Sequence, residues 1–217
     1  MKTFDFSGKN VLIRVDFNVP QDDQLNITDN TRIKAALPTI SAVLKAGGTA
    51  VLMSHLGRPN GERSAKCSLG SLVGELKSLT GATVYFAEDC IGDAAKDVIE
   101  AAGPGEIVLL ENLRFYKEET DGDREFAGAL AELGDIYLND AFGTAHRAHA
   151  STAIIAEYFG DDDKGFGSLM EAEVKSISKA LGSHRATTVA IIGGAKVSSK
   201  IGVISNMLEK VGTLVIG

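Results

Sequence analysis

Runs of aliphatic residues alternate with amphipathic segments along the whole chain. The run at 10–18, NVLIRVDFN, predicts a buried β-strand, and apolar residues at helical spacing follow it over 31–48. We expect Pro38 to disturb that helix and Gly47 and Gly48 to end it. The same order recurs and predicts further strands at 49–55, 82–86, 106–112, 135–140, 187–194 and 213–217, and further helices at 68–81, 93–102, 124–134, 168–182 and 198–212.

This alternation predicts an α/β fold, a three-layer Rossmann-like parallel sheet with helices on both faces. The segment at 159–167, FGDDDKGFG, breaks the alternation with glycines and like charges, and we interpret it as the edge of a domain. We therefore expect an N-terminal α/β domain at 1–167, a linker helix within 168–186 and the start of a second α/β domain at 187–217. One βαβ unit cannot cover its own sheet, so we expect the chain to be the front part of a longer protein.

The composition limits the class of protein and its partners. Hydrophobic residues make up 44% of the chain and charged residues 24%, which is typical of a globular protein with a buried core. The net charge of −7 argues against nucleic acid or an anionic membrane as a partner. The N-terminus lacks the apolar region of a signal peptide, so we expect a cytoplasmic protein. Cys67 and Cys90 form no CxxC pair, and we interpret them as unpaired thiols in a reducing compartment.

Polar and cationic side chains follow several of the predicted strands. Ligands of open parallel sheets bind beyond the carboxyl ends of the strands. Arginine forms bidentate bonds to phosphate and carboxylate, so arginines gathered at this edge of an acidic protein predict a small ligand with several negative charges. Asp16 and Asn18 would orient a hydroxyl group of that ligand. The polar candidates are Asp16 and Asn18 after the first strand, His55 and Arg58 after the second, Arg114 and Arg147 after later strands, and Arg32 near the start of the first helix.

Each of these residues also has a simpler interpretation. An arginine after a strand is commonly a surface ion-pair partner, and an aspartate such as Asp16 is commonly a turn former. A lone histidine is commonly solvated, so we assign no role to His146 or His184. The repetition of the same chemistry at several strand ends is what favours a binding site.

The second predicted domain carries a different pattern, IIGGAKVSSK. Gly193 and Gly194 lie between a buried strand and a helix, where a phosphate can approach the backbone and the helix N-terminus. Lys196 and Lys200 are four residues apart and would share one helix face. The pattern is neither the P-loop nor the dinucleotide fingerprint, so by itself it leaves the phosphate site open.

Taken together, these stretches resemble the motifs of the phosphoglycerate kinase family. The motifs are RVDFNVP, TDNTRI, SHLGRP, ENLRF, NDAFGTAHRAHAST and GGAKVSSKI, in the same order and at similar spacing as in that family. The resemblance covers all 217 residues, and its loosest stretch is SAKCSLGSL at 64–72.

The resemblance implies an enzyme that reversibly transfers the acyl phosphate of 1,3-bisphosphoglycerate to magnesium-ADP, giving 3-phosphoglycerate and ATP, and that is monomeric at full length. The acceptor oxygen is already ionised, so this chemistry needs positioning and cationic stabilisation rather than a general base. The 217-residue chain alone is expected to bind 3-phosphoglycerate without turnover, because the magnesium ligands of the family would lie beyond it. By motif, the resemblance implies a glycerate site of Asp16, Phe17, Asn18, Arg32, His55, Leu56, Gly57, Arg58, Arg114 and Arg147, a nucleotide site of Gly193, Gly194, Lys196 and Lys200, and catalytic roles for Arg32, Lys196 and Lys200.

Two other classes of protein remain open from the residues alone. A non-catalytic α/β module that senses a small phosphorylated acid would keep the arginines but would not need the glycine and lysine pattern at 193–200. A nicotinamide-dependent dehydrogenase would need a glycine fingerprint after the first strand, where Asp16, Phe17 and Asn18 stand instead.

Overall fold

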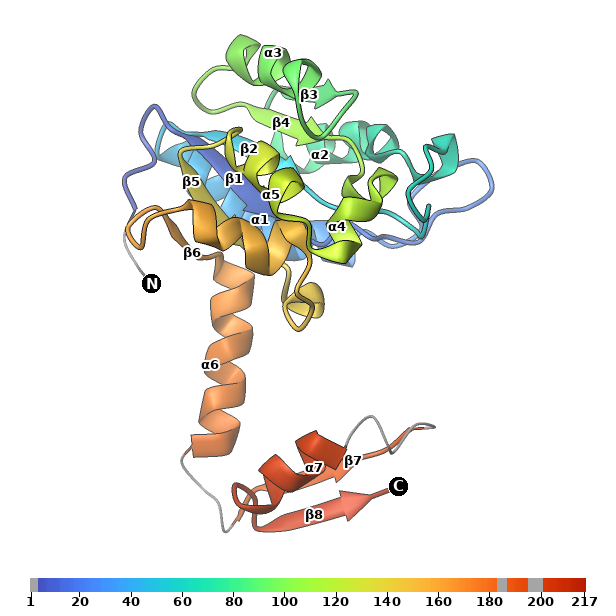
Figure 1. The fold of residues 1–217 in the computed structure, drawn as a ribbon, viewed down its shortest axis with the longest axis vertical. Helices are drawn as coiled ribbons and strands as arrows, with labels where there is room; N and C mark the ends of the chain where they lie inside the picture. The colour runs from blue at the N-terminus through green and yellow to red at the C-terminus, as the bar shows by residue number, and fades with distance from the viewer. Residues whose placement is uncertain (1–3, 183–186, 195–200) are drawn as a thin grey trace. The chain divides into compact units, whose positions relative to one another are not determined.

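The computed structural model describes residues 4–182, 187–194 and 201–217. The chain divides into two compact units, Met1–Met170 and Glu171–Gly217. The first unit contains a six-stranded sheet with the strand order β3-β4-β2-β1-β5-β6, in which all neighbouring strands run parallel (Figure 1). Its strands are β1 (Asn10–Arg14), β2 (Thr49–Met53), β3 (Val84–Ala87), β4 (Ile107–Leu110), β5 (Ile136–Asn139) and β6 (Lys164–Phe166).

Helices cover both faces of this sheet. Successive strand residues point to opposite faces, so each strand contributes apolar side chains to both. Val11 and Ile13 of β1 belong to the core cluster that contains Ile40 of α1, whereas Leu12 belongs to the cluster that contains Leu130 of α5. The predicted three-layer α/β fold is therefore confirmed. Helices α1 (Thr31–Lys45) and α2 (Val73–Thr80) contribute to the first cluster, and α3 (Asp93–Ala101) and α5 (Arg124–Ala131) contribute to the second.

The register of the strands brings the loops after them to one edge. Arg14, the last residue of β1, pairs with Met53 of β2 and with Asn139 of β5. The loops that follow these strands therefore leave the sheet at the same level. Leu52 also pairs with Leu109, so the loop after β4 joins them.

Four local features differ from the sequence-based expectations. Helix α1 runs without interruption through Pro38, so the expected disturbance did not break it. The segment at 159–167 contains β6, whose Gly165 pairs with Leu138; the prediction missed this strand because it lacks an aliphatic run. A short helix, α4 (Lys117–Asp121), and a turn of π-helix, Ala150–Ile154, were also not predicted.

Helix α6 (Ser168–Gly182) begins in the first unit. Asp140, directly after β5, accepts hydrogen bonds from the Leu169 and Met170 N–H groups at 2.9 and 3.1 Å. The Ser168 N–H donates to Thr39 Oγ1 of α1 at 2.8 Å. The unpaired N–H groups of the first turn are thereby satisfied by two elements of the sheet domain.

The second unit has a parallel pair of strands, β7 (Val189–Ile192) and β8 (Thr213–Ile216), with α7 (Ile201–Leu208) between them in sequence. Several of its apolar side chains are exposed. The exposed fraction of Ile191, for example, is 76%. One βαβ unit has too few elements to cover both faces of its strands. None of the helices in the described residues is long and apolar enough to cross a membrane.

Candidate anion-binding site

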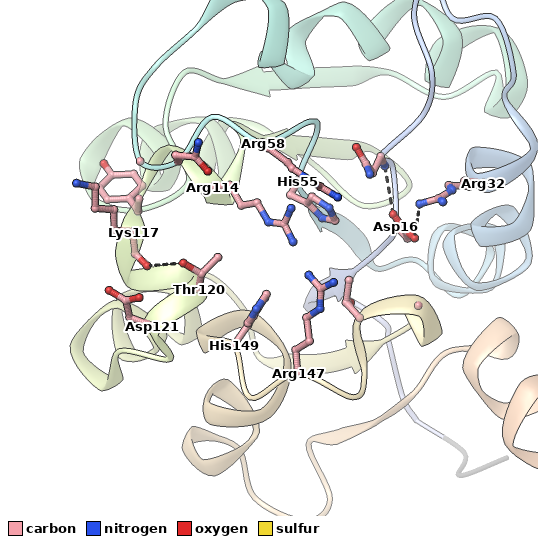
Figure 2. A pocket seen from close by; sticks show the side chains of 16 residues that line it. Asp16, Arg32, His55, Arg58, Arg114, Lys117, Thr120, Asp121, Arg147 and His149 are labelled. Atoms are coloured by element: carbon pink, nitrogen blue, oxygen red, sulfur yellow. Dashed lines mark hydrogen bonds and ion pairs between the residues drawn. The ribbon is translucent and has the colours of Figure 1, made fainter. Parts of the chain in front are cut away.

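A cavity of about 610 Å³ opens at the carboxyl edge of the six-stranded sheet, among the loops that follow β1, β2, β4 and β5 (Figure 2). It contains all the polar side chains that the sequence predicted for this edge. Its lining is Asp16, Asn18, Arg32, His55, Arg58, Asn60, Gly61, Arg114, Tyr116, Lys117, Thr120, Asp121, Gly143, Thr144, Arg147 and His149.

The predicted apolar candidates lie behind this lining. The side chains of Phe17 and Leu56 are buried in the core. Gly57 has a φ of +67°, and a Cβ there would lie 2.9 Å from Cys67 Sγ, so the position requires glycine. The Gly57 N–H donates to Asn18 Oδ1 at 2.8 Å, which ties the loop after β2 to the loop after β1. These three residues support the cavity wall and are not among the residues that line it.

The cationic side chains approach one another across the cavity. Figure 2 shows Arg114 and Arg147 pointing toward its centre from opposite sides. Burial, and then the charges of Arg147 and Arg14, lower the pKa of Arg114. Among the described residues, no hydrogen-bond partner reaches the buried Arg114 Nε. A ligand with negative charge between these arginines would relieve their repulsion.

Arg32 lies at the rim of the cavity beside the loop after β1. Its Nη1 donates to Asp16 Oδ2 at 2.8 Å, and about half of its side chain is exposed. The ion pair leaves other N–H groups of the guanidinium free to reach a group that enters from outside the sheet domain.

Both histidines of the cavity are neutral at physiological pH. Burial, followed by the charges of Arg14 and Arg114, lowers the pKa of His55 to about 2. Burial and then Arg114 and Arg147 lower the pKa of His149 to about 4. His55 Nδ1 lies 3.3 Å from Arg14 Nη2, and arginine can only donate, so Nδ1 is the acceptor and the ring proton is on Nε2. No sequence pattern distinguished His149 from its neighbours.

Two charged residues lie behind the cavity that were not among the residues predicted from the sequence, Arg14 and Glu119. Both are fully buried. Arg14 belongs to the strand itself, so it was treated as part of the strand pattern; a charged residue within the run NVLIRV was the available clue. Its Nε donates to Ser151 Oγ at 2.9 Å and its Nη1 donates to the Val15 carbonyl.

The second unit places Gly193 and Gly194 directly after β7. Gly194 has a φ of +119°, and within the described part of the chain a Cβ at Gly193 would meet only the Gly217 carbonyl, at 3.8 Å. The loop therefore suits the close approach of a phosphate to the backbone. Lys196 and Lys200 lie outside the described residues. Among the residues that are described, no group of three or more His, Cys, Asp or Glu side chains could hold a metal ion.

Comparisons with known proteins agree with one another. The family model for phosphoglycerate kinase matches residues 1–217. The phosphoglycerate kinase of Ruegeria pomeroyi is 49% identical over 213 residues, covering 98% of this chain and 52% of its own. That of Moorella thermoacetica is 50% identical over 217 residues, covering 100% and 54%. The solved structure of phosphoglycerate kinase from Coxiella burnetii has a TM-score of 0.84 at 37% identity, covering 100% of this chain and 53% of that one. The chain spans about half the length of the curated relatives that it matches.

Proposed function

Because the chain belongs to the phosphoglycerate kinase family, we propose that it forms the glycerate-binding part of an enzyme that reversibly transfers the acyl phosphate of 1,3-bisphosphoglycerate to magnesium-ADP. The observation that carries this proposal is the convergence of Arg58, Arg114, Arg147 and neutral His55 on one cavity. The phosphate and carboxylate of 3-phosphoglycerate are the complementary groups. Asp16 would accept a hydrogen bond from the substrate hydroxyl.

The proposed chemistry depends on cations rather than on a general base. The carboxylate or phosphate oxygen that accepts the phosphoryl group is already ionised, so no proton has to be removed. Arg32, with its exposed guanidinium at the rim, would stabilise the negative charge that spreads over the transferring group. His55 would act as a neutral hydrogen-bond donor through Nε2, because its low pKa keeps it unprotonated on Nδ1.

The nucleotide would be held by the second unit. Gly193 and Gly194 would let its phosphates approach the backbone, and Lys196 and Lys200 would add positive charge. Magnesium bound with ADP would neutralise the phosphate oxygens. We assign 1–167 to glycerate binding, 168–186 to a linker helix and 187–217 to nucleotide binding, in a monomeric, cytoplasmic enzyme. By itself the 217-residue chain would bind 3-phosphoglycerate without turnover.

Calorimetric titration of the chain with 3-phosphoglycerate tests the proposal. We expect binding that weakens as the salt concentration rises, because the contacts are ionic. Arg114→Ala should weaken binding by about 2 kcal/mol, the cost of a lost charged hydrogen bond. Arg124→Ala is the matched control, since Arg124 is an exposed arginine on α5 whose partner is Glu157. A folded chain that binds no 3-phosphoglycerate, or equal losses in both variants, would refute the assignment of the cavity.

A further inference from the structure

A carboxylate lies buried behind the positively charged cavity. Glu119 on α4 is fully buried. Its Oε2 accepts a hydrogen bond from the Ser151 N–H at 2.9 Å, and its Oε1 accepts one from the Ser151 hydroxyl at 2.7 Å. His149 Nδ1 lies 3.7 Å from the same Oε1. Glu119 thus links the segment after β4 to the segment after β5, which carries Arg147 into the cavity.

The hydrogen bonds continue from Glu119 to the histidine of the cavity. The Ser151 hydroxyl donates its proton in the hydrogen bond to Glu119. The Ser151 oxygen therefore accepts the hydrogen bond that Arg14 Nε donates, at 2.9 Å. The guanidinium of Arg14 then lies with Nη2 at 3.3 Å from His55 Nδ1. The carboxylate accepts the Ser151 hydroxyl proton, and the guanidinium of Arg14 can only donate, so the direction of every bond in this series is fixed. The series ends with the His55 proton on Nε2.

Electrostatics alone does not explain a carboxylate in this place. A negative charge behind an anion site weakens the binding of an anion by Coulomb repulsion. Burial also raises the pKa of Glu119, an effect that Arg14 and the two Ser151 hydrogen bonds oppose. Glu119 offsets these costs by balancing the buried charge of Arg14 and by the geometry that it imposes on its hydrogen-bond partners.

We propose that Glu119 is a positioning residue of the anion site: through Ser151 and Arg14 it keeps His55 as an Nε2–H donor, and through Ser151 it holds the segment that carries Arg147 and His149. The proposal deepens the proposed function, since it takes the anion to be 3-phosphoglycerate. It makes the affinity of the cavity depend on a side chain that does not line it.

The substitution Glu119→Gln separates positioning from simple electrostatics by the sign of its effect. The amide keeps the shape of the side chain and removes the charge. If Glu119 acted only as a nearby negative charge, its removal would strengthen 3-phosphoglycerate binding. If it positions the site, binding measured by calorimetry should weaken by about tenfold or more, because charged hydrogen bonds are lost. Glu118→Gln is the matched control: it removes the same charge from an exposed neighbour on the same helix and should not weaken binding.

A second measurement needs no ligand and so does not depend on the proposed function. In nitrogen-15 NMR spectra of histidine-labelled protein, His55 should show an unprotonated Nδ1 and a protonated Nε2 throughout about pH 6 to 8. His55→Asn assigns the signal. In Glu119→Gln, and in Ser151→Ala, the donor to Nδ1 is no longer held, so His55 should become a mixture of tautomers or take up a proton in this range. Ser151→Ala keeps the proposal testable if Glu119→Gln does not fold.

The outcomes separate the two proposals. A wild-type chain that binds no 3-phosphoglycerate would contradict the proposed function, while the NMR spectra would still test the role of Glu119. Unchanged affinity or tighter binding in folded Glu119→Gln would overturn the positioning role. So would a His55 signal that is the same in wild type, Glu119→Gln and Ser151→Ala.

Discussion

Acidification should destabilise the first unit through its buried histidines. His55 and His149 are neutral in the folded protein, because burial and the neighbouring arginines lower their pKa values to about 2 and about 4. In the unfolded chain a histidine has a pKa of about 6.5. Below that value the unfolded state binds more protons than the folded state, so the free energy of unfolding falls as the pH falls.

The size of the effect follows from these values. Between neutral pH and about pH 5, the protonation of one histidine in the unfolded chain lowers the free energy of unfolding by about 2 kcal/mol. His55 and His149 together should therefore lower it by about 4 kcal/mol. Glu119 and Asp140 act in the opposite direction, since burial raises their pKa values and the folded state then takes up protons first. The contribution of one histidine has to be isolated by comparison with a variant.

Urea unfolding followed by circular dichroism, at several values between about pH 7.5 and about pH 5, gives this comparison. His55→Asn places an amide oxygen near the position of Nδ1 and has no proton to gain. The contributions of His149 and the carboxylates cancel in the difference between the two proteins. We expect the wild type to lose about 2 kcal/mol more than His55→Asn over this range. Parallel curves for the two proteins would show that His55 is accessible to protons in the folded state and would refute the reasoning.

Three further outcomes are expected. In a phosphoglycerate kinase that carries this sequence, Arg32→Ala should lower kcat and kcat/KM by the same factor, on the order of a hundredfold, if Arg32 acts in the transition state as we propose; a rise in KM alone would contradict this. Gly167→Ala should lower the free energy of unfolding by about 1–3 kcal/mol in urea titrations, since the new Cβ would overlap the side chain of Asp140, which receives the first turn of α6. A thiol reagent should label partly exposed Cys67 and leave Cys90 unlabelled until the protein unfolds, because Cys90 is buried and its burial raises the pKa of the thiol. Equal labelling rates for the two cysteines in the folded chain would be the contrary result.

The candidate site was predictable to the extent that its residues follow strands. Asp16, His55, Arg114 and Arg147 stand directly after or shortly after aliphatic runs, and the carboxyl ends of parallel strands meet at one edge. The sequence pattern therefore predicted their proximity without any knowledge of the strand order. The motifs also pointed to the family that the comparisons show.

The sequence by itself determined the α/β alternation, the three layers and the cationic edge, because these depend on the period of apolar residues and on the residues beside each run. Only the tertiary structure decided the order of the strands, the inclusion of β6 and the hydrogen bonds that join Glu119, Ser151 and Arg14. Ser151 is separated from Arg14 by 137 positions and from Glu119 by 32. Such contacts arise when crossovers bring distant segments together in a dry interior. There a buried charge must find partners, wherever they lie in the sequence.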